Sequence, residues 1–200
     1  MSTSFASIVA DVITLTNRPD LVNETNLAVR AATLKAHQFD DWVKDLREQS
    51  IQFATSDYYQ SLDYKSIFPL WRKPKYIRKY DNTPYTGGPT DFLTYIPPEK
   101  VVDEYGLNRT NIYYVAGSQV QIRTEEPYQY FICGYYANPD VTIANYNSWI
   151  ANDHPFAIIY EAAAVIIKAV GLDEQAVMYR DMVNEQMADL IKHGITGTGM

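Results

Sequence analysis

The segment Pro155-Phe-Ala-Ile-Ile-Tyr-Glu-Ala-Ala-Ala-Val-Ile-Ile-Lys-Ala-Val170 contains the longest uninterrupted apolar run of the chain, Ala162 to Ile167. Proline is favoured at the first position of a helix, and the residues after it place apolar side chains on every side of the helical period. A helix of this kind is covered by neighbouring helices. Gly171 ends it, and the apolar spacing predicts a second helix from Leu172 to about His193. We therefore expect a C-terminal αα-hairpin whose first arm is the centre of the fold.

The N-terminal part of the chain also has helical spacing. Apolar residues three and four positions apart predict a helix over Phe5 to Leu15, and Asn23 is a suitable cap for a second, alanine-rich helix. A third helical stretch is predicted over Trp42 to about Gln49. Together with the C-terminal hairpin, these segments predict a helical core made of residues 1–56 and 141–200.

The intervening residues, 57–140, shift towards an apolar period of two. This zone holds most of the seventeen tyrosines and nearly all of the ten prolines. A glycine turn at Gly117 between two valine-containing runs predicts a short hairpin. We therefore expect an α+β fold: a helical bundle with a C-terminal αα-hairpin and an inserted, small antiparallel β-sheet region. The predicted strands are Ser66 to Leu70, Lys75 to Tyr80, Phe92 to Ile96, Ile112 to Val115, Gln119 to Thr124 and Gln129 to Tyr136.

The composition limits the class of protein. The 200 residues carry a net charge of −7 and a single cysteine, Cys133, so an intrachain disulfide is excluded. An acidic balance argues against general nucleic-acid binding, because affinity for phosphate comes from cations. We recognise no secretory leader and no apolar run long enough to span a bilayer, so we expect a chain without membrane contact that is made in the cytoplasm. The surplus of tyrosine favours contacts with other proteins.

Residues that could carry catalysis or bind a metal are few. The three histidines lie in different predicted elements. His37 stands one helical turn before Asp40 and Asp41, a spacing that metal ligands sometimes use, but a solvated helix end is the favoured interpretation. Cys133 lies in an apolar and aromatic run, which favours a buried thiol over a nucleophile. We therefore expect no enzymatic activity, no cofactor and no metal.

One stretch of the acidic chain is basic. Residues 71–80 interleave five cations with aromatic side chains, a pattern that single-stranded nucleic-acid binders use for backbone contact and base stacking. The favoured interpretation is a charged edge strand, or a strand that meets an acidic partner. The candidate contact residues are Arg72, Lys73, Lys75, Arg78 and Lys79.

Two glycine-containing segments remain as candidates. The stretch from Asp81 to Thr90 is a loop by its turn residues. The stretch from Gly194 to Met200 follows the last predicted helix and is either a frayed terminus or a segment that becomes ordered against a partner.

Taken in order, these features resemble those of bacteriophage head-to-tail adaptor proteins, the ring-forming connectors that lie beneath the portal. The resemblance covers nearly the whole chain in arrangement, and its motifs are short and carry no catalytic chemistry. The matching stretches are Val12-Ile-Thr-Leu-Thr-Asn-Arg-Pro-Asp-Leu21, Ala36-His37, Asp41-Trp42, Asp45-Leu46, Tyr135-Tyr136-Ala-Asn-Pro139 and Ser148-Trp149-Ile-Ala151.

The resemblance implies a virion structural protein of the neck, assembled in the host cytoplasm. It would form a dodecameric ring that joins the portal to the tail and lets double-stranded DNA pass without specific binding. The implied partners are further copies of the chain, the portal protein, and tail or nozzle proteins. Single-stranded nucleic-acid binding through residues 71–80 is the alternative function. The portal-binding candidates are Gly194, Ile195, Thr196, Gly197, Thr198, Gly199 and Met200, and the candidates facing the tail are Asn82, Tyr85, Gly87 and Gly88.

Overall fold

The computed structural model describes residues 3–80, 89–102 and 107–192 of the chain. The chain forms two compact units. The helical unit consists of Met1–Asp45 and Asn138–Met200, and the strand unit consists of Leu46–Ala137. The boundaries therefore follow Asp45 and Ala137, whereas the sequence pattern places them after residues 56 and 140.

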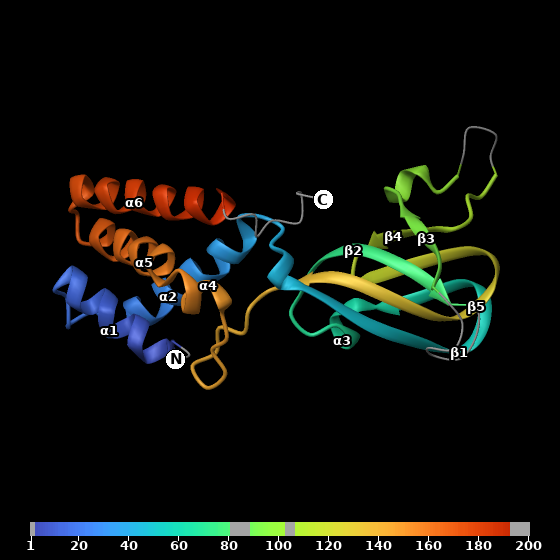
Figure 1. Cartoon of the computed structure of the whole chain (residues 1–200), viewed down its shortest axis with the longest axis horizontal. Helices are drawn as coiled ribbons and strands as arrows, with labels where there is room; N and C mark the ends of the chain where they lie inside the picture. Colours follow the sequence, from blue (N-terminus) through green and yellow to red (C-terminus); the bar gives the residue numbers. More distant parts are fainter. Residues whose placement is uncertain (1–2, 81–88, 103–106, 193–200) are drawn as a thin grey trace. The chain divides into compact units, whose positions relative to one another are not determined.

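The helical unit is built around one apolar helix, α5. This helix packs against α6, α2, α1 and α4, and its residues Ile158, Ala162 and Ala163 are fully buried. The small alanine side chains let neighbouring helices approach closely, and Figure 1 shows α5 and α6 running side by side in opposite directions. The elements are α1 (Phe5–Thr16), α2 (Val22–Gln38), the 3-10 helix η1 (Val43–Asp45), α4 (Trp149–Asp153), α5 (Pro155–Ala169) and α6 (Asp173–Lys192).

Local signals account for the ends of these helices. The Ser4 hydroxyl accepts a hydrogen bond from the Ser7 amide and caps α1, which ends at Asn17 in the left-handed conformation. Pro155 occupies the first turn of α5, where its missing N–H costs nothing. Gly171 has a φ of 83° between α5 and α6, a value that favours glycine. Among the described residues, no helix combines the length and the apolar character needed to cross a bilayer.

The strand unit is a sheet that closes on itself. Its strand order is β1-β5-β2-β3-β4, and β4 also pairs with β5. The β3–β4 pair is parallel and the other pairs are antiparallel. The two longest strands, β1 and β5, lie side by side along the unit (Figure 1). The elements are β1 (Leu46–Asp63), α3 (Tyr64–Ile67), β2 (Trp71–Tyr80), β3 (Pro89–Tyr95), the 3-10 helix η2 (Pro98–Lys100), β4 (Ile112–Ala116) and β5 (Gln119–Ala137).

Strand β5 organises the unit because it pairs with β1, β2 and β4. Its register with β1 shifts between Gln52 and Tyr59, next to the solvent-exposed stretch Glu125 to Pro127 of β5. This irregularity lets one long strand contact different neighbours in its two halves. The side chains that point inward form an aromatic and aliphatic core that includes Ile77, Val120, Ile122, Phe131 and Cys133.

The predicted fold class is wrong in its description of the sheet. Within the described residues, six α-helices are combined with a closed four-strand β-barrel and one extra strand, instead of a helical bundle with a small inserted antiparallel sheet. The barrel strands are β5, β2, β3 and β4, and β1 is the extra strand on β5. The prediction failed because barrel closure depends on the β2–β5 and β3–β4 pairings, which join residues far apart in sequence and have no local signal.

Individual segments explain the error. The helix predicted over Trp42 to Gln49 gives way to η1 and the start of β1, whose residues pair with distant positions, such as Leu46 with Tyr136. The strand predicted over Ser66 to Leu70 is instead the end of α3 and a turn in which Leu70 has a φ of 62°. The predicted hairpin at Gly117 is confirmed by the pairing of Val115 with Val120.

Candidate functional site

The basic stretch lies on β2, and its five cations occupy three different environments. Arg72, Lys73 and Lys75 gather around the ring of Tyr136, with their charged groups 5.4, 5.7 and 5.6 Å from its centroid. The ring is itself buried, with 1% exposure. Attraction between cations and the face of an aromatic ring therefore holds three positive charges close together.

Arg78 occupies the second environment, between two aromatic rings. Its guanidinium carbon lies 4.1 Å from the centroid of Phe92, its direct neighbour on β3, and 4.9 Å from that of Tyr76. The Arg78 Nε is buried and has no hydrogen-bond partner among the described residues. Phe92 is 55% exposed. This part of the sheet therefore presents a cation between two rings, and no carboxylate of the described residues forms an ion pair with it.

Tyr76 is held in place by its neighbours on β5 and β1. It pairs with Gly134, and a Cβ atom at that glycine would lie 2.5 Å from the tyrosine ring. Only glycine leaves the room that the ring needs over the β5 backbone. The Tyr76 hydroxyl donates a hydrogen bond to Glu48, which pairs with Gly134 from the other side. The Tyr76 ring, one of the two rings beside Arg78, is therefore held in a fixed position.

Lys79 has the third environment and is buried. Its Nζ lies 3.2 Å from Asn111 Oδ1, 3.6 Å from a Glu125 carboxylate oxygen and 4.9 Å from the centroid of the Tyr128 ring. The hydrogen bond from Asn111, and then the charge of Lys79, lower the pKa of Glu125. These contacts join β2 to the neighbouring parts of the barrel, so Lys79 stabilises the barrel.

The aromatic residue that opens the basic stretch is also engaged. Trp71 stacks on Tyr64, Phe68 and Tyr135, with ring centroids 5.0, 5.1 and 5.3 Å apart. This arrangement places Trp71 in an aromatic cluster at the end of the strand unit where α3 lies. Its ring faces are largely occupied by protein neighbours.

The helical unit contains a polar network centred on His37. The His37 Nδ1 lies 2.8 and 3.0 Å from the two carboxylate oxygens of Asp45, and its Nε2 lies 2.8 Å from Ser148 Oγ. Trp149 Nε1–H donates to the same Asp45 carboxylate at 2.8 Å, and Ser148 Oγ accepts a hydrogen bond from the Ala151 amide. The network joins the end of α2, η1 and the start of α4.

The order Ser148, His37, Asp45 reproduces the contacts of a hydrolase triad, in which a histidine bridges a nucleophile and a carboxylate. All three residues are buried, with exposures of 2%, 1% and 6%. A substrate cannot reach the Ser148 hydroxyl, which already caps α4. The arrangement therefore acts as a buried polar connection between elements.

The other chemical candidates have similar environments. Cys133 is fully buried, and burial raises the pKa of its thiol to about 12, so the thiol stays protonated at neutral pH. In the described part of the chain, no group of three histidine, cysteine, aspartate or glutamate residues gathers as a metal site.

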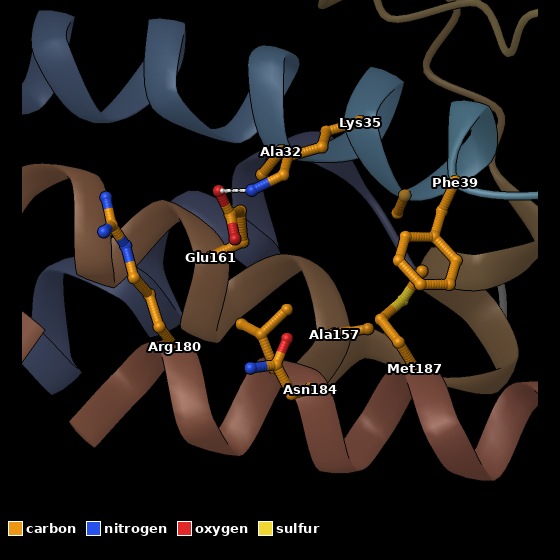
Figure 2. A pocket seen from close by; sticks show the side chains of 10 residues that line it. Ala32, Lys35, Phe39, Ala157, Glu161, Arg180, Asn184 and Met187 are labelled. Carbon is orange, nitrogen blue, oxygen red and sulfur yellow. Dashed lines mark hydrogen bonds and ion pairs between the residues drawn. The ribbon is translucent and has the colours of Figure 1, made fainter. Parts of the chain in front are cut away.

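A groove runs between α2, α5 and α6 of the helical unit (Figure 2). Its volume is about 260 Å³, enough for one or two apolar side chains. Alanines of α2 and α5 line it together with Val183 and Met187, and the half-exposed ring of Phe39 borders one end. Lys35 Nζ donates to Glu161 Oε1 at 2.6 Å across the groove, and Arg180 lies towards the other end. Glu161 is the one carboxylate that lines the groove, and it is already paired with Lys35. A ligand in the groove would therefore contact mainly apolar surface.

Several predicted site residues lie outside the described residues, namely the portal-binding candidates from Gly194 to Met200 and the loop candidates Asn82, Tyr85, Gly87 and Gly88. The structure brings together residues that the sequence interpretation kept apart. Asp45 and Ser148 meet at His37, and Phe92 meets Arg78. The cap position of Ser148 was a usable local signal, but a contact between residues 111 positions apart was not.

No protein-family model matches the chain, and no curated protein shows a significant match.

Proposed function

We propose that the chain is a structural protein of the bacteriophage neck, an adaptor that forms a dodecameric ring between portal and tail. It has no enzymatic activity, needs no cofactor and lets double-stranded DNA pass without binding it specifically. Its site of action is the virion, after assembly in the host cytoplasm. The order of segments along the chain and the exposed surface of the strand unit both support this function.

The observation that carries the proposal is the exposure of large aromatic side chains in the strand unit. Tyr58, Tyr59, Phe92 and Tyr95 are 50%, 57%, 55% and 52% exposed. Aromatic side chains are enriched at protein interfaces, because they bury much area and lose little conformational entropy. Exposed aromatic side chains are therefore expected on a subunit whose surface is covered by neighbours in an assembly.

The division into two unlike units also supports a ring. A closed ring uses heterologous contacts, in which one patch of a subunit meets a different patch of the next. The helical unit presents helix faces and a groove, and the strand unit presents a sheet with cations and aromatic rings. Two chemically different surfaces on one chain satisfy this requirement.

We assign the outer partners by the resemblance. Residues 194–200 contact the portal, residues 82–88 face the next tail component, and the overall negative charge of −7 keeps the passing DNA from adhering to the ring. Both segments lie outside the described residues, and the order of segments along the chain supports the assignments.

Cryo-microscopy of assembled particles tests the proposal directly. We expect a ring of this chain between portal and tail, and purified portal should recruit the chain into rings. Particles that lack the chain would overturn the proposal. Deleting residues 194–200 should leave hydrogen-exchange protection of both units unchanged and reduce incorporation into particles. Equal incorporation of the truncated and full-length chains would refute the assignment of that segment.

The nucleic-acid alternative has less support. Trp71 is stacked among Tyr64, Phe68 and Tyr135, and Lys79 is buried beside Glu125, so two of its proposed contact residues serve the strand unit. A salt titration separates the two functions. Single-stranded DNA binding that falls steeply with salt, and is lost on replacing Arg72 and Arg78 with alanine, would favour the alternative.

A further inference from the structure

We propose that the acidic outer face of α6 in one copy docks on the Arg78–Phe92 face of the strand unit in the next copy. The acidic outer face consists of Glu174, Asp181 and Glu185 with the neighbouring Val177 and Met178. The Arg78–Phe92 face consists of Arg78, Phe92 and Tyr76. The inference rests on the proposed ring and identifies the two surfaces that close it.

Helix α6 buries one side and leaves its acidic side uncovered. The buried residues are spaced three and four positions apart, from Ala176 to Leu190. At 3.6 residues per turn, Glu174, Asp181 and Glu185 lie on the opposite side. All three are exposed, and in the described part of the chain none of their carboxylates takes part in an ion pair or a side-chain hydrogen bond.

Apolar side chains interrupt this acidic side. Val177 is 56% exposed and Met178 is 47% exposed. Two adjacent large apolar residues gain nothing from exposure to water on a solvated helix face. Between charged groups they are typical of a protein interface. The thioether of Met178 is suited to contact with an aromatic ring.

The Arg78–Phe92 face has the complementary chemistry. Arg78 lies 4.1 Å from the centroid of the exposed Phe92 ring, and its buried Nε lacks an acceptor. A carboxylate from another copy would neutralise the guanidinium. The chain has 24 acidic and 17 basic residues, and yet the described structure gives Arg78 no carboxylate partner. Arginine and aromatic residues are the usual centres of interface binding energy.

The contact is heterologous because a helix face meets a sheet face. Each copy carries both surfaces and uses each of them once, with a different neighbour. Such contacts form rings when the rotation between neighbours closes. A second copy is therefore an occupant that accounts for both unpartnered surfaces at the same time.

A charge exchange tests the contact in portal-templated ring assembly, measured by mass photometry. Arg78→Glu and Asp181→Arg, each alone, should reduce the yield of rings about tenfold, because each places like charges together. The chain with both substitutions should recover most of the yield. Lys65→Glu and Asp11→Arg make the same charge changes at exposed positions of α3 and α1 and should leave the yield unchanged. Arg78→Gln, with native circular dichroism as a folding check, repeats the loss without introducing a buried carboxylate.

Cysteine cross-linking distinguishes a contact between copies from one within a chain. The chain with Met178→Cys and Phe92→Cys should give a ladder of covalent oligomers on oxidation of assembled rings, while the native Cys133 stays buried and unreactive. Rings that form normally in both single charge variants, or a loss in the single variants that the double variant does not rescue, would overturn this contact and leave the proposed function standing. A cross-link confined to monomers would also overturn it. A wild-type chain that forms no ring and is missing from particles would refute the proposed function itself.

Discussion

The two units reach a folded core by different routes. The core of the helical unit is mostly aliphatic, with isoleucines and alanines of α5 surrounded by α1, α2 and α6. The core of the strand unit is rich in aromatic rings, and its contacts join distant residues, such as Ile51 with Phe131. Helices select their buried side by local spacing, whereas strands need a partner before they have a buried side. The difference shows why the long helices of one unit were visible as a pattern, whereas the closure of the sheet in the other unit was not.

Replacing Trp42 with alanine should have the largest effect and confine it to the helical unit. Trp42 is fully buried, its Nε1–H donates to the Ala36 carbonyl at 3.0 Å, and its ring meets that of Trp149 edge to face. Loss of such a side chain costs about 3–5 kcal/mol. Hydrogen exchange followed by mass spectrometry should show protection lost in α2 and α5 and retained in β2 and β5. Trp71→Ala should give the reverse pattern, and equal losses in both units would contradict separate cores.

Replacing Asp45 with alanine should have the next largest effect and sharpen the account of the helical unit. The substitution leaves the buried His37 ring and the Trp149 Nε1–H without their acceptor, at a cost of about 2–3 kcal/mol. Asp153→Ala is the matched control, because Asp153 pairs with Lys44 on the surface, where ion pairs contribute less than about 1 kcal/mol. Urea unfolding measures both. Similar losses in the free energy of unfolding for the two variants would show that the buried network contributes no more to stability than the surface ion pair.

The substitution Gly134→Ala tests the strand unit in the same way. An added methyl group collides with the ring of Tyr76, and overpacking of this kind costs about 1–3 kcal/mol. Removing the ring with Tyr76→Ala should make the second substitution nearly harmless, so the two changes should be strongly non-additive in a double-mutant cycle. Additive costs would mean that the ring is not held over Gly134.

Alkaline pH should produce the smallest effect and weaken the strand unit. Below about pH 9 the Cys133 thiol is protonated in the folded and unfolded states alike, and it adds no pH dependence. Above that pH the thiol ionises in the unfolded chain, while burial holds the folded thiol protonated up to about 12. The free energy of unfolding should therefore fall by about 1 kcal/mol per pH unit. Cys133→Ala should flatten this slope in pH-dependent urea unfolding; the buried Tyr113, whose pKa is also raised, contributes only at higher pH. An unchanged pH dependence of the free energy of unfolding in Cys133→Ala would show that groups other than Cys133 cause the loss of stability.

Residues with strong local signals were predictable. The apolar helix over Pro155 to Ala169, the cap of α1 at Ser4 and the hairpin at Gly117 all follow from their immediate neighbours. Strand β1 was not predicted, since its start was assigned to a helix ending near Gln49 and the first predicted strand began at Ser66. The spacing around Ile51 suits either a helix or a strand. Only its pairing with β5 decides between them.

The candidate site follows the same division. The five cations of residues 71–80 were visible in the sequence, but their separation into a cluster on Tyr136, an arginine between two rings and a buried lysine was not. Phe92 supplies one of those rings from another strand. The His37 network likewise needs Asp45 and Ser148, which meet only after α2 and α4 have packed.

The sequence by itself determined the long helices α1, α2, α5 and α6, together with the acidic side of α6 and the basic character of β2. Helical hydrogen bonds and side-chain periodicity involve residues within about one turn of one another, so they leave a local pattern. The tertiary structure decided the closure of the barrel, the burial of Lys79 and the isolation of Arg78 between Tyr76 and Phe92. Those features depend on strand pairs such as Arg78 with Ile132, whose members are distant in sequence. No local pattern records a partner that far away, so only the folded sheet selects it.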